Sequence, residues 1–326
     1  MINIVVDMMG SDEGSKITVG AIKEYLKTDK NVYFICVGNK EELKDLENES
    51  NCKLVYSETV VKMDADPMEA LKDKKSSLMM AIKEINENNY DAFLSAGGTG
   101  PVLSAATLKI KRLPGIIRPG LLTSFPTIIK DKKMTVCDLG ANAECTAKNI
   151  EQFAIMSSLF YKFVYGKEDP CVYHLNIGTE EHKGREVDRE VYSLLKMNEH
   201  INFKGNIEGR EALEGNCDCL VCDGYSGNIF LKSTEGCAKM MSKLLKNSFK
   251  KNLLTKIGYL FAKSGIDEMK STMDYKNVGG AMLVGVNKVV VKAHGNSDVR
   301  AFIAAIKLTK KLVESNIISK FEENLK

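Results

Sequence analysis

The chain has 326 residues, of which 44% are hydrophobic and 27% are charged, and its 46 lysines and arginines exceed its 43 aspartates and glutamates by three. These proportions are typical of a globular protein and exclude a disordered chain, a collagen and a coiled coil. The small surplus also argues against bulk nucleic-acid binding, but it leaves room for a local basic patch. The length fits two domains of about 150 residues or one large unit.

The N-terminal residues predict a strand rather than a targeting segment. Residues 1–7 lack the basic start and the long apolar core of a signal peptide. No run of the chain approaches the roughly 18 apolar residues that would span a bilayer. We therefore expect a cytoplasmic protein whose nine cysteines are reduced thiols.

Short apolar runs alternate with longer helical patterns along the chain. Strands are predicted at Ile2–Val6, Val32–Val37, Ala92–Ser95, Met134–Asp138, Cys171–Asn176, Cys219–Cys222 and Val289–Lys292. Helices are predicted at Ser15–Lys27, Ser76–Glu87, Val102–Lys111, Ile150–Val164, Glu186–Met197 and Asp298–Val313. This alternation predicts βαβ units around a mostly parallel sheet with helices on both faces.

Five glycine-containing turns directly follow predicted strands. They contain Asp, Asn, Ser or Thr beside glycine, and they lie at residues 7–10, 95–100, 138–142, 176–178 and 223–228. Ligands of open α/β sheets bind at the carboxyl ends of strands. There glycine permits close approach of the backbone, and a following helix offers free N–H groups to an anion. One such turn is usually structural, but five together predict a polar anion-binding cleft.

These turns do not match the common nucleotide-binding or hydrolase motifs. Residues 97–100 read Gly-Gly-Thr-Gly rather than Gly-x-Gly-x-x-Gly. The chain has neither a Gly-x-x-x-x-Gly-Lys-Ser/Thr loop nor a Gly-x-Ser-x-Gly elbow. An NAD enzyme, a P-loop ATPase and a serine hydrolase are therefore disfavoured.

The cysteines and histidines give weaker signals. Cys219 and Cys222 form a single C-x-x-C within an apolar run, which favours buried core thiols over a zinc site. His174 lies within a predicted strand and is interpreted as structural. His182 and His294 begin turns, where a histidine can face a ligand.

Segment 236–266 is strongly basic and amphipathic. It contains seven lysines and no acidic residue, so the rest of the chain has a net charge of 3 − 7 = −4. Its apolar residues recur at helical spacing, and 247–252 is interpreted as a break between two helices. Such a helix can lie on an anionic membrane, or it can pack against the core or a partner subunit. The candidate membrane contacts are Leu253, Leu254, Ile257, Leu260 and Phe261.

The polar turns, taken in order, resemble those of the bacterial acyl-acyl-carrier-protein:phosphate acyltransferases of phospholipid synthesis. The residues that carry the resemblance are Val6–Asp12, Ser95–Gly100, Asp138–Asn142, Gln152–Ala154, Asn176–Glu180, Lys183, Gly184, Gly205–Arg210, Cys222–Asn228, Lys232, Glu235, Gly236, Gly279–Ala281 and His294–Asp298. The match runs nearly from end to end. This chain departs from the family pattern at Ser11, at Gly98 and at Thr146–Ala147.

The resemblance implies a reaction and a fold. Acyl carrier protein carrying an acyl thioester and inorganic phosphate would give acyl phosphate and free carrier protein. The fold would be an α/β protein, the three-layer α/β/α sandwich of phosphotransacetylases and isocitrate dehydrogenase-like proteins. Residues 1–326 would form a single catalytic unit, paired as a homodimer, with no metal or nucleotide cofactor. Segment 236–266 would contact the membrane peripherally, because a glycerol-3-phosphate acyltransferase consumes acyl phosphate there.

The reaction sets the roles that the resemblance assigns to individual residues. Phosphate must be aimed at the thioester carbonyl, the oxyanion needs preplaced donors, and the thiolate leaves with little acid help. Catalytic roles fall to Lys183 at the phosphate or oxyanion, to Asn228 at the carbonyl oxygen, and to His294 at the phosphate or thiol. The expected substrate-binding residues are Gly97, Gly98, Thr99, Asn142, Asp223 and Arg210.

Two alternatives stay open at this point. A phosphotransacetylase acting on a small acyl-coenzyme A shares the chemistry and the fold, and a panel of thioesters separates the two. A non-catalytic, membrane-associated scaffold that recruits acyl carrier protein belongs to a different class. Carrier binding without phosphate-dependent turnover would identify such a scaffold.

Overall fold

The structure, a computed structural model, describes residues 1–273 and 279–325. Its strands are β1 (Ile2–Asp7), β2 (Val32–Gly38), β3 (Cys52–Tyr56), β4 (Ala92–Ser95), β5 (Gly120–Pro126), β6 (Lys133–Cys137), β7 (Cys171–Leu175), β8 (Asn202–Ile207), β9 (Cys219–Val221), β10 (Ala281–Val284) and β11 (Val289–Lys292). Its helices are α1 (Ser15–Leu26), α2 (Lys40–Leu43), α3 (Pro67–Ala70), α4 (Ser77–Glu87), α5 (Thr99–Ala105), α6 (Ala147–Tyr165), α7 (Glu186–Met197), α8 (Gly224–Lys250), α9 (Leu253–Met273), α10 (Val299–Glu314) and α11 (Ile317–Asn324).

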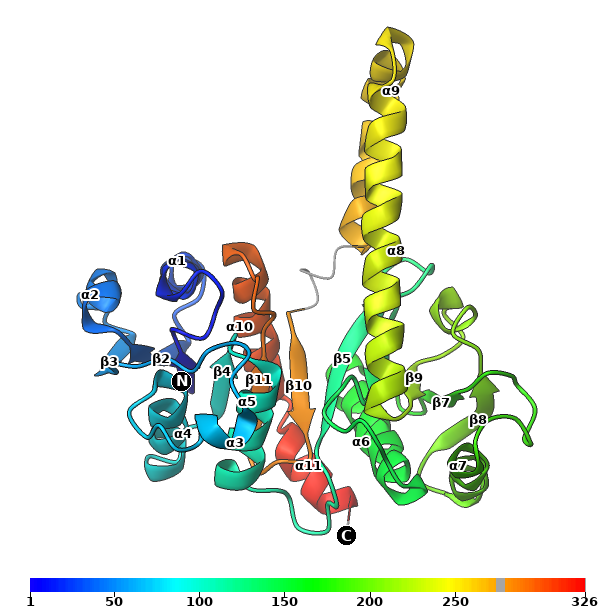
Figure 1. Ribbon diagram of the computed structural model, residues 1–326, viewed down its shortest axis with the longest axis horizontal. Coiled ribbons are helices and arrows are strands. Elements are labelled where there is room, and N and C mark those ends of the chain that lie inside the picture. Colours follow the sequence, from blue (N-terminus) through cyan, green and yellow to red (C-terminus); the bar gives the residue numbers. More distant parts are fainter. Residues whose placement is uncertain (274–278, 326) are drawn as a thin grey trace.

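The strands form an 11-stranded mixed sheet in the order β3-β2-β1-β4-β11-β10-β5-β6-β9-β7-β8. One block, from β3 to β11, is parallel, and the block from β6 to β8 is parallel as well. Between them, β10 pairs antiparallel with both β11 and β5, and β5 pairs antiparallel with β6. The two blocks form the two halves of the molecule in Figure 1.

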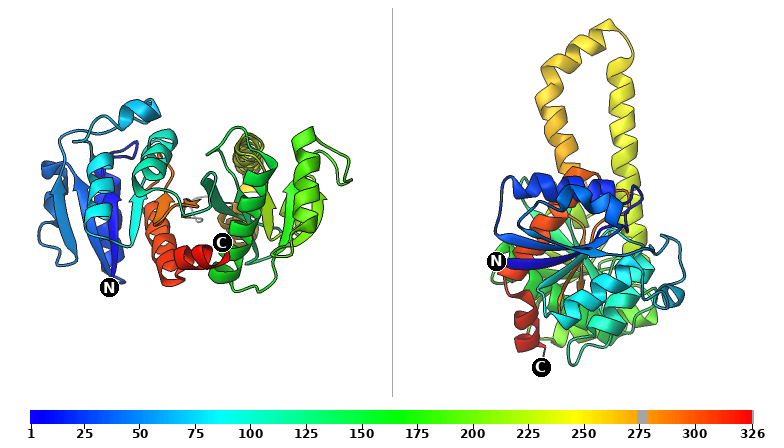
Figure 2. Two further views of the ribbon diagram at one scale, coloured as in Figure 1. Left: turned by 90° about the horizontal axis from the view of Figure 1, so that it is seen from below. Right: turned by 90° about the vertical axis from the view of Figure 1, so that its left-hand side faces the viewer.

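Alternating side chains of the strands face two separate helical layers. In β1, Ile4 and Val6 belong to a core cluster that includes Ile22 of α1 and Phe302 of α10. Val5, between them, belongs to a second cluster with Ile82 of α4. Because successive side chains of a strand point to opposite faces, these contacts place helices on both sides of the sheet, as Figure 2 also shows. The expected three-layer α/β/α arrangement is confirmed.

The predicted elements agree closely with the observed ones. Each of the seven predicted strands is present within one residue at either end, and the six helices are present within about three residues. The predicted helix over 102–111 starts earlier, at Thr99, and continues from α5 into a π-helical turn over Ala106–Ile110. Sequence analysis missed β3, β5, β8 and β10. Of these, β3 and β8 are only partly buried and carry lysines, so neither reads as a buried apolar run.

α8 and α9 form a helical hairpin that projects from the body of the molecule (Figures 1 and 2). The expected break within 247–252 is confirmed, since α8 ends at Lys250 and α9 begins at Leu253. Among the described residues of α9 none is buried, and Leu254 and Phe261 are 79% and 86% exposed. No helix within the described ranges has the length and apolarity needed to cross a membrane.

Candidate active site

A cavity of about 1090 Å³ opens between the two blocks of the sheet. Both blocks contribute to its wall, because Thr99 follows β4, Gly140 follows β6 and His294 follows β11. α8 contributes Asn228 near its N-terminus. Thr99, Asn228 and His294, three residues expected at the site from sequence, are therefore brought together on one cavity.

Lys292, the last residue of β11, is a buried lysine on the cavity wall. It is 8% exposed, and its ammonium group donates a hydrogen bond to the carbonyl oxygen of Ala293. Burial lowers the pKa of Lys292 to about 8, while the carboxylates of Asp12 and Asp7 act in the opposite direction. Sequence analysis missed this residue because it lies at the end of an apolar core strand. A lysine in that position, two residues before His294, is the signal that identifies it.

Charged side chains of both signs lie around His294. Burial, together with the charges of Lys292 and Lys232, lowers the pKa of His294, while the carboxylates of Glu235 and Asp12 act in the opposite direction. Its Nδ1 accepts a 3.3 Å hydrogen bond from the amide of Asn296. Lys232 forms an ion pair of 3.1 Å with Glu235, one turn along α8. We call Lys232, Lys292 and His294 the cationic cluster after its two lysines, whose ammonium groups suit a phosphate as point charges. The lowered pKa of His294 favours its uncharged imidazole, which contributes hydrogen bonding rather than charge.

Two neutral donors lie on the same cavity. Asn228 packs against the turn after β6, where a Cβ built on Gly140 would lie 3.5 Å from the side-chain nitrogen of Asn228. Thr99 is the first residue of α5. An amide N–H and a hydroxyl can each donate to a carbonyl oxygen, and preplaced donors of this kind stabilise an oxyanion. The cavity thus combines anion-binding and carbonyl-binding groups.

The turn after β6 holds a buried carboxylate rather than presenting free amides. Asp138 Oδ1 accepts hydrogen bonds from the amides of Gly140 and Ala141 at 3.2 and 3.0 Å. Its Oδ2 accepts from the amide and the side chain of Asn142 at 2.8 and 2.9 Å. The Asn142 side chain also donates to the carbonyl of Pro119 at 2.8 Å. In this structure the donors of Asn142 are therefore engaged in holding the turn, and its expected role in anion binding stays a prediction.

Gly97 and Gly98 permit close packing beside the cavity instead of lining it. A Cβ on Gly98 would lie 2.5 Å from the carbonyl oxygen of Met63, which is too close for any side chain. The amide of Gly97 donates to Ser95 Oγ at 2.9 Å. These contacts fix the backbone that carries Thr99 to the cavity wall.

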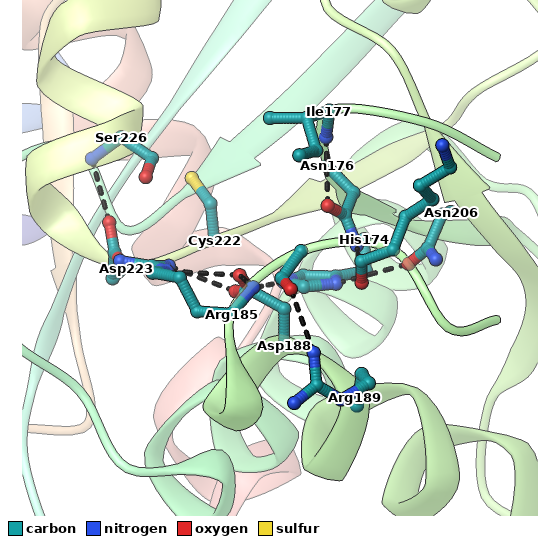
Figure 3. A network of polar contacts seen from close by, with 12 residues as sticks. His174, Asn176, Ile177, Arg185, Asp188, Arg189, Asn206, Cys222, Asp223 and Ser226 are labelled. Atoms are coloured by element: carbon teal, nitrogen blue, oxygen red, sulfur yellow. Dashed lines mark hydrogen bonds and ion pairs between the residues drawn. The ribbon is translucent and has the colours of Figure 1, made fainter. Parts of the chain in front are cut away.

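Asp223 and Arg185 tie two neighbouring segments together, as Figure 3 shows. Asp223 caps α8 by accepting a 2.7 Å hydrogen bond from the amide of Ser226. The Arg185 guanidinium donates to Asp223 at 2.6 Å and to Asp188 at 2.9 Å. Burial opposes ionisation of Asp188, but the hydrogen bonds from Arg185 outweigh it and lower the pKa of Asp188. The residues before α7 are thereby fastened to the start of α8, and Asp223 itself stays off the cavity wall.

His174 completes this network from β7 (Figure 3). It is 1% exposed, and its Nδ1 lies 3.2 Å from Asn206 Oδ1. Because the Asn206 side-chain nitrogen donates to the carbonyl of Glu180, its Oδ1 is left to accept from the imidazole. Burial lowers the pKa of His174. The interpretation of His174 as structural is confirmed.

Lys183 and Arg210 lie outside the residues that line the cavity. The Lys183 ammonium is 3.9 Å from a Glu180 oxygen, and its side chain is half-exposed. Arg210 forms an ion pair of 2.6 Å with Glu208, and its side chain is 77% exposed. His182, which was expected to begin a turn as His294 does, is exposed. Their roles at the site stay predictions.

The cysteines of the C-x-x-C run are core residues, as expected. Cys217, Cys219 and Cys222 are buried, and the thiol of Cys219 contacts the carbonyl oxygen of Ser157. Within residues 1–273 and 279–325, no group of three or more His, Cys, Asp or Glu side chains is placed to hold a metal ion.

Solved structures with a similar fold include two phosphotransacetylases. A phosphotransacetylase from Streptococcus pyogenes aligns with a TM-score of 0.61 and 17% identity, covering 98% of this chain and 94% of that one. The EutD phosphotransacetylase from Staphylococcus aureus aligns with a TM-score of 0.59 and 16% identity, covering 96% and 94%. At this identity the likeness shows the fold alone, and it confirms the expected phosphotransacetylase-like architecture.

Sequence comparison is more specific. The family described as "Fatty acid synthesis protein" matches residues 2–320. The chain is 37% identical over 324 residues to a phosphate acyltransferase of Thermoanaerobacter pseudethanolicus, covering 99% of this chain and 97% of the relative. It is 39% identical over 327 residues to a phosphate acyltransferase of Thermosipho melanesiensis, covering 100% and 97%. The chain therefore belongs to the fatty acid synthesis protein family, together with these phosphate acyltransferases.

Proposed function

We propose that the protein transfers an acyl group from acyl carrier protein to inorganic phosphate, giving acyl phosphate and free carrier protein. The observation that carries this proposal is the cationic cluster on the wall of a largely apolar cavity. Such a cavity suits two substrates at once, an inorganic dianion and an acyl chain. Membership in a family with curated phosphate acyltransferases supports the same reaction.

The residues on the cavity suggest how the reaction proceeds. Lys292 and Lys232 hold phosphate by charge, and His294 orients it by hydrogen bonding. A phosphate oxygen attacks the thioester carbonyl, and the developing oxyanion accepts hydrogen bonds from the Asn228 amide and the Thr99 hydroxyl. The carbon–sulfur bond then breaks and the thiolate leaves, which needs little acid help because a free thiol has a pKa of about 8.5.

Lys183 is assigned a supporting part in this proposal. It lies in the segment that Arg185 fastens to α8, and α8 also carries Asn228 and Lys232. From there its ammonium adds positive charge for phosphate or for the oxyanion. Arg210, which is highly exposed, is proposed to meet the acidic carrier protein.

The decisive experiment is mass-spectrometric detection of acyl phosphate from palmitoyl carrier protein and phosphate. We expect Asn228→Ala and His294→Ala to lower the rate by about a hundredfold, the usual loss for one oxyanion or substrate donor. Asn48→Ala, which changes an exposed turn residue, serves as the matched control. Rates within about threefold of wild type for both site variants would contradict the assignment. Turnover of acetyl-coenzyme A alone would favour a phosphotransacetylase, and carrier binding without turnover would favour a scaffold.

We also propose that the hairpin tip contacts the membrane peripherally. Leu253, Leu254, Ile257, Leu260 and Phe261 are all exposed on the described surface. Lysines recur along the same hairpin, with no acidic residue over 236–266. Each lysine near an anionic surface contributes about 1 kcal/mol of attraction, and the apolar side chains add insertion into the interface.

Flotation with anionic liposomes tests the membrane proposal. We expect the double variant Leu254→Glu plus Leu260→Glu to lose binding. Met68→Glu plus Met197→Glu adds the same two charges at exposed sites off the hairpin, and it should bind as wild type does. Equal flotation of wild type and the hairpin variant would refute the proposal. The homodimer and the glycerol-3-phosphate acyltransferase as downstream partner stay predictions.

A further inference from the structure

The cavity continues past the cationic cluster along the helical hairpin. On α8 the lining residues run from Asn228 through Lys232 and Glu235 to Ala238, a rise of about 15 Å along the helix. Residues on this stripe recur at helical spacing, so one face of α8 forms the wall throughout. The charged residues lie on the part of the stripe nearer the sheet, and Ala238 marks its far end.

The far part of the cavity, which we call the outer limb, has mainly apolar walls. α9 contributes Gly265 and Met269, and β5 with the following turn contributes Phe125 and Ile128. An ion pair of 2.8 Å between Lys130 and Glu268 joins that turn to α9. The ion pair thereby links the hairpin to the β5–β6 turn, and the outer limb lies between them as a groove that is open to solvent at Ile128 and Gly265.

We propose that the outer limb binds the acyl chain of the substrate and that Gly265 sets the length of chain it accepts. This inference rests on the proposed function, which places the thioester carbonyl at Asn228. A chain attached to that carbonyl has to occupy adjoining volume, and the outer limb is apolar and continuous with the site. Burying each methylene group there is favourable. The total volume of the cavity, about 1090 Å³, lies just above the usual range for small-molecule pockets, about 300–1,000 Å³.

Gly265 is suited to set the depth of the outer limb because it has no side chain, so the space beside its Cα is left open. A Cβ built on this residue would meet nothing within 4 Å. Its backbone is helical, so a leucine there removes a helix-destabilising glycine without straining the chain. It shares a face of α9 with Met269 and Met273, which also line the cavity. A longer side chain at 265 would therefore narrow the limb while the cationic cluster stays unchanged.

The test compares acyl carrier proteins charged with octanoyl and palmitoyl chains. In Gly265→Leu we expect kcat/KM for the palmitoyl donor to fall at least about tenfold, the effect of losing two buried methylene groups. The octanoyl donor should stay within about twofold. Gly236→Leu is the matched control, since its Cβ also meets nothing within 4 Å and it is absent from the cavity wall. An active Gly265→Leu enzyme with an unchanged ratio of the two donors overturns the inference.

A second measurement needs no turnover and uses the wild-type protein. Cys237 lines the cavity and is the exposed member of nine cysteines, all of which fall in the described part of the chain. Without phosphate, palmitoyl carrier protein should slow maleimide labelling of Cys237 at least about fivefold relative to carrier protein without an acyl chain. Equal labelling overturns the inference. A wild-type enzyme that forms no acyl phosphate from either donor instead refutes the proposed function, which separates the two failures.

Discussion

Replacing Lys292 by methionine separates two effects of this lysine. One is the free energy that burying its charge costs the folded protein, and the other is its proposed contribution to phosphate binding. In the folded protein its pKa is about 8, against an ordinary value of 10.5. A difference of this size corresponds to about 3 kcal/mol at 1.36 kcal/mol per pKa unit. Between pH 8 and 10.5 the folded state binds fewer protons than the unfolded state, so the free energy of unfolding rises as the pH is raised through this window. Below pH 8 Lys292 is charged in both states, and there the full cost of burying its charge destabilises the protein. Methionine keeps most of the apolar stem and removes the charge.

We therefore expect Lys292→Met to be more stable than wild type at pH 7 and nearly inactive. Losing the hydrogen bond to the Ala293 carbonyl costs about 1 kcal/mol, which leaves a net gain of about 2 kcal/mol. For a chain of 326 residues this raises Tm by roughly 3 °C. Phosphate-dependent turnover should fall at least about thirtyfold, because a charge-assisted contact worth about 2 kcal/mol is lost.

Differential scanning calorimetry and the acyl phosphate assay check the two expectations together. Lys288→Met is the control, since Lys288 precedes the same strand but is only partly buried, and its ammonium group donates a hydrogen bond to Asn89. Its Tm and activity should match wild type. The gain in Tm of Lys292→Met should shrink as the pH is raised from 8 toward 10.5. A lower Tm at pH 7, or activity within threefold of wild type, would refute the reasoning.

Three further expectations follow from contacts at the site. In the wild-type protein, kcat/KM for phosphate should fall as the pH rises through about 8, where Lys292 loses its proton. A value of kcat/KM that does not change from pH 7 to 9 would contradict this expectation. Gly227→Ala should destabilise the protein by several kcal/mol, because the new Cβ would lie 1.9 Å from the Asp138 carbonyl oxygen. Gly258→Ala is the control: its new Cβ would meet nothing within 4 Å, and the protein should become about 0.5–1 kcal/mol more stable. Urea denaturation measures the free energy of unfolding of both variants. Arg185→Leu should lower kcat more than it raises KM for phosphate, since it frees the segment before α7 from Asp223; unchanged kinetics would show that this tie is not needed.

Much of the fold could be predicted because local patterns agree with it. Apart from β3 and β8 at the two edges, the strands of the parallel blocks are mainly apolar runs, and the helices between them carry clear periodicity. The central strands were harder to recognise. β5 reads Gly-Leu-Leu-Thr-Ser-Phe-Pro and β10 has four residues, and their pairing joins residues that are far apart in sequence. Such pairing is set by tertiary contacts rather than by propensity.

The site was predictable only in part, for a related reason. Asn228 and His294 lie in glycine-containing turns, a pattern that predicts ligand binding, and both line the cavity. Asn142 stands in an equally suggestive turn, yet its donors serve the buried carboxylate of Asp138. Lys292 lies in a strand and not in a glycine-containing turn, so no turn motif identifies it as a site residue. Its candidacy rests on its burial beside other charged side chains. Sequence identifies which groups can bind an anion, while burial and the neighbouring acceptors decide which of them are free to do so.

α8 is a single helix of 27 residues, about 40 Å long, and its uninterrupted length has a mechanical consequence. Asn228 and Lys232 lie near one end and the exposed hairpin tip lies beyond the other. A small tilt of such a helix at the cavity would move the tip through a larger distance. In the membrane contact proposed above, a shift of the tip would likewise be passed along α8 to Asn228 and Lys232, although the membrane itself would touch none of the reacting groups.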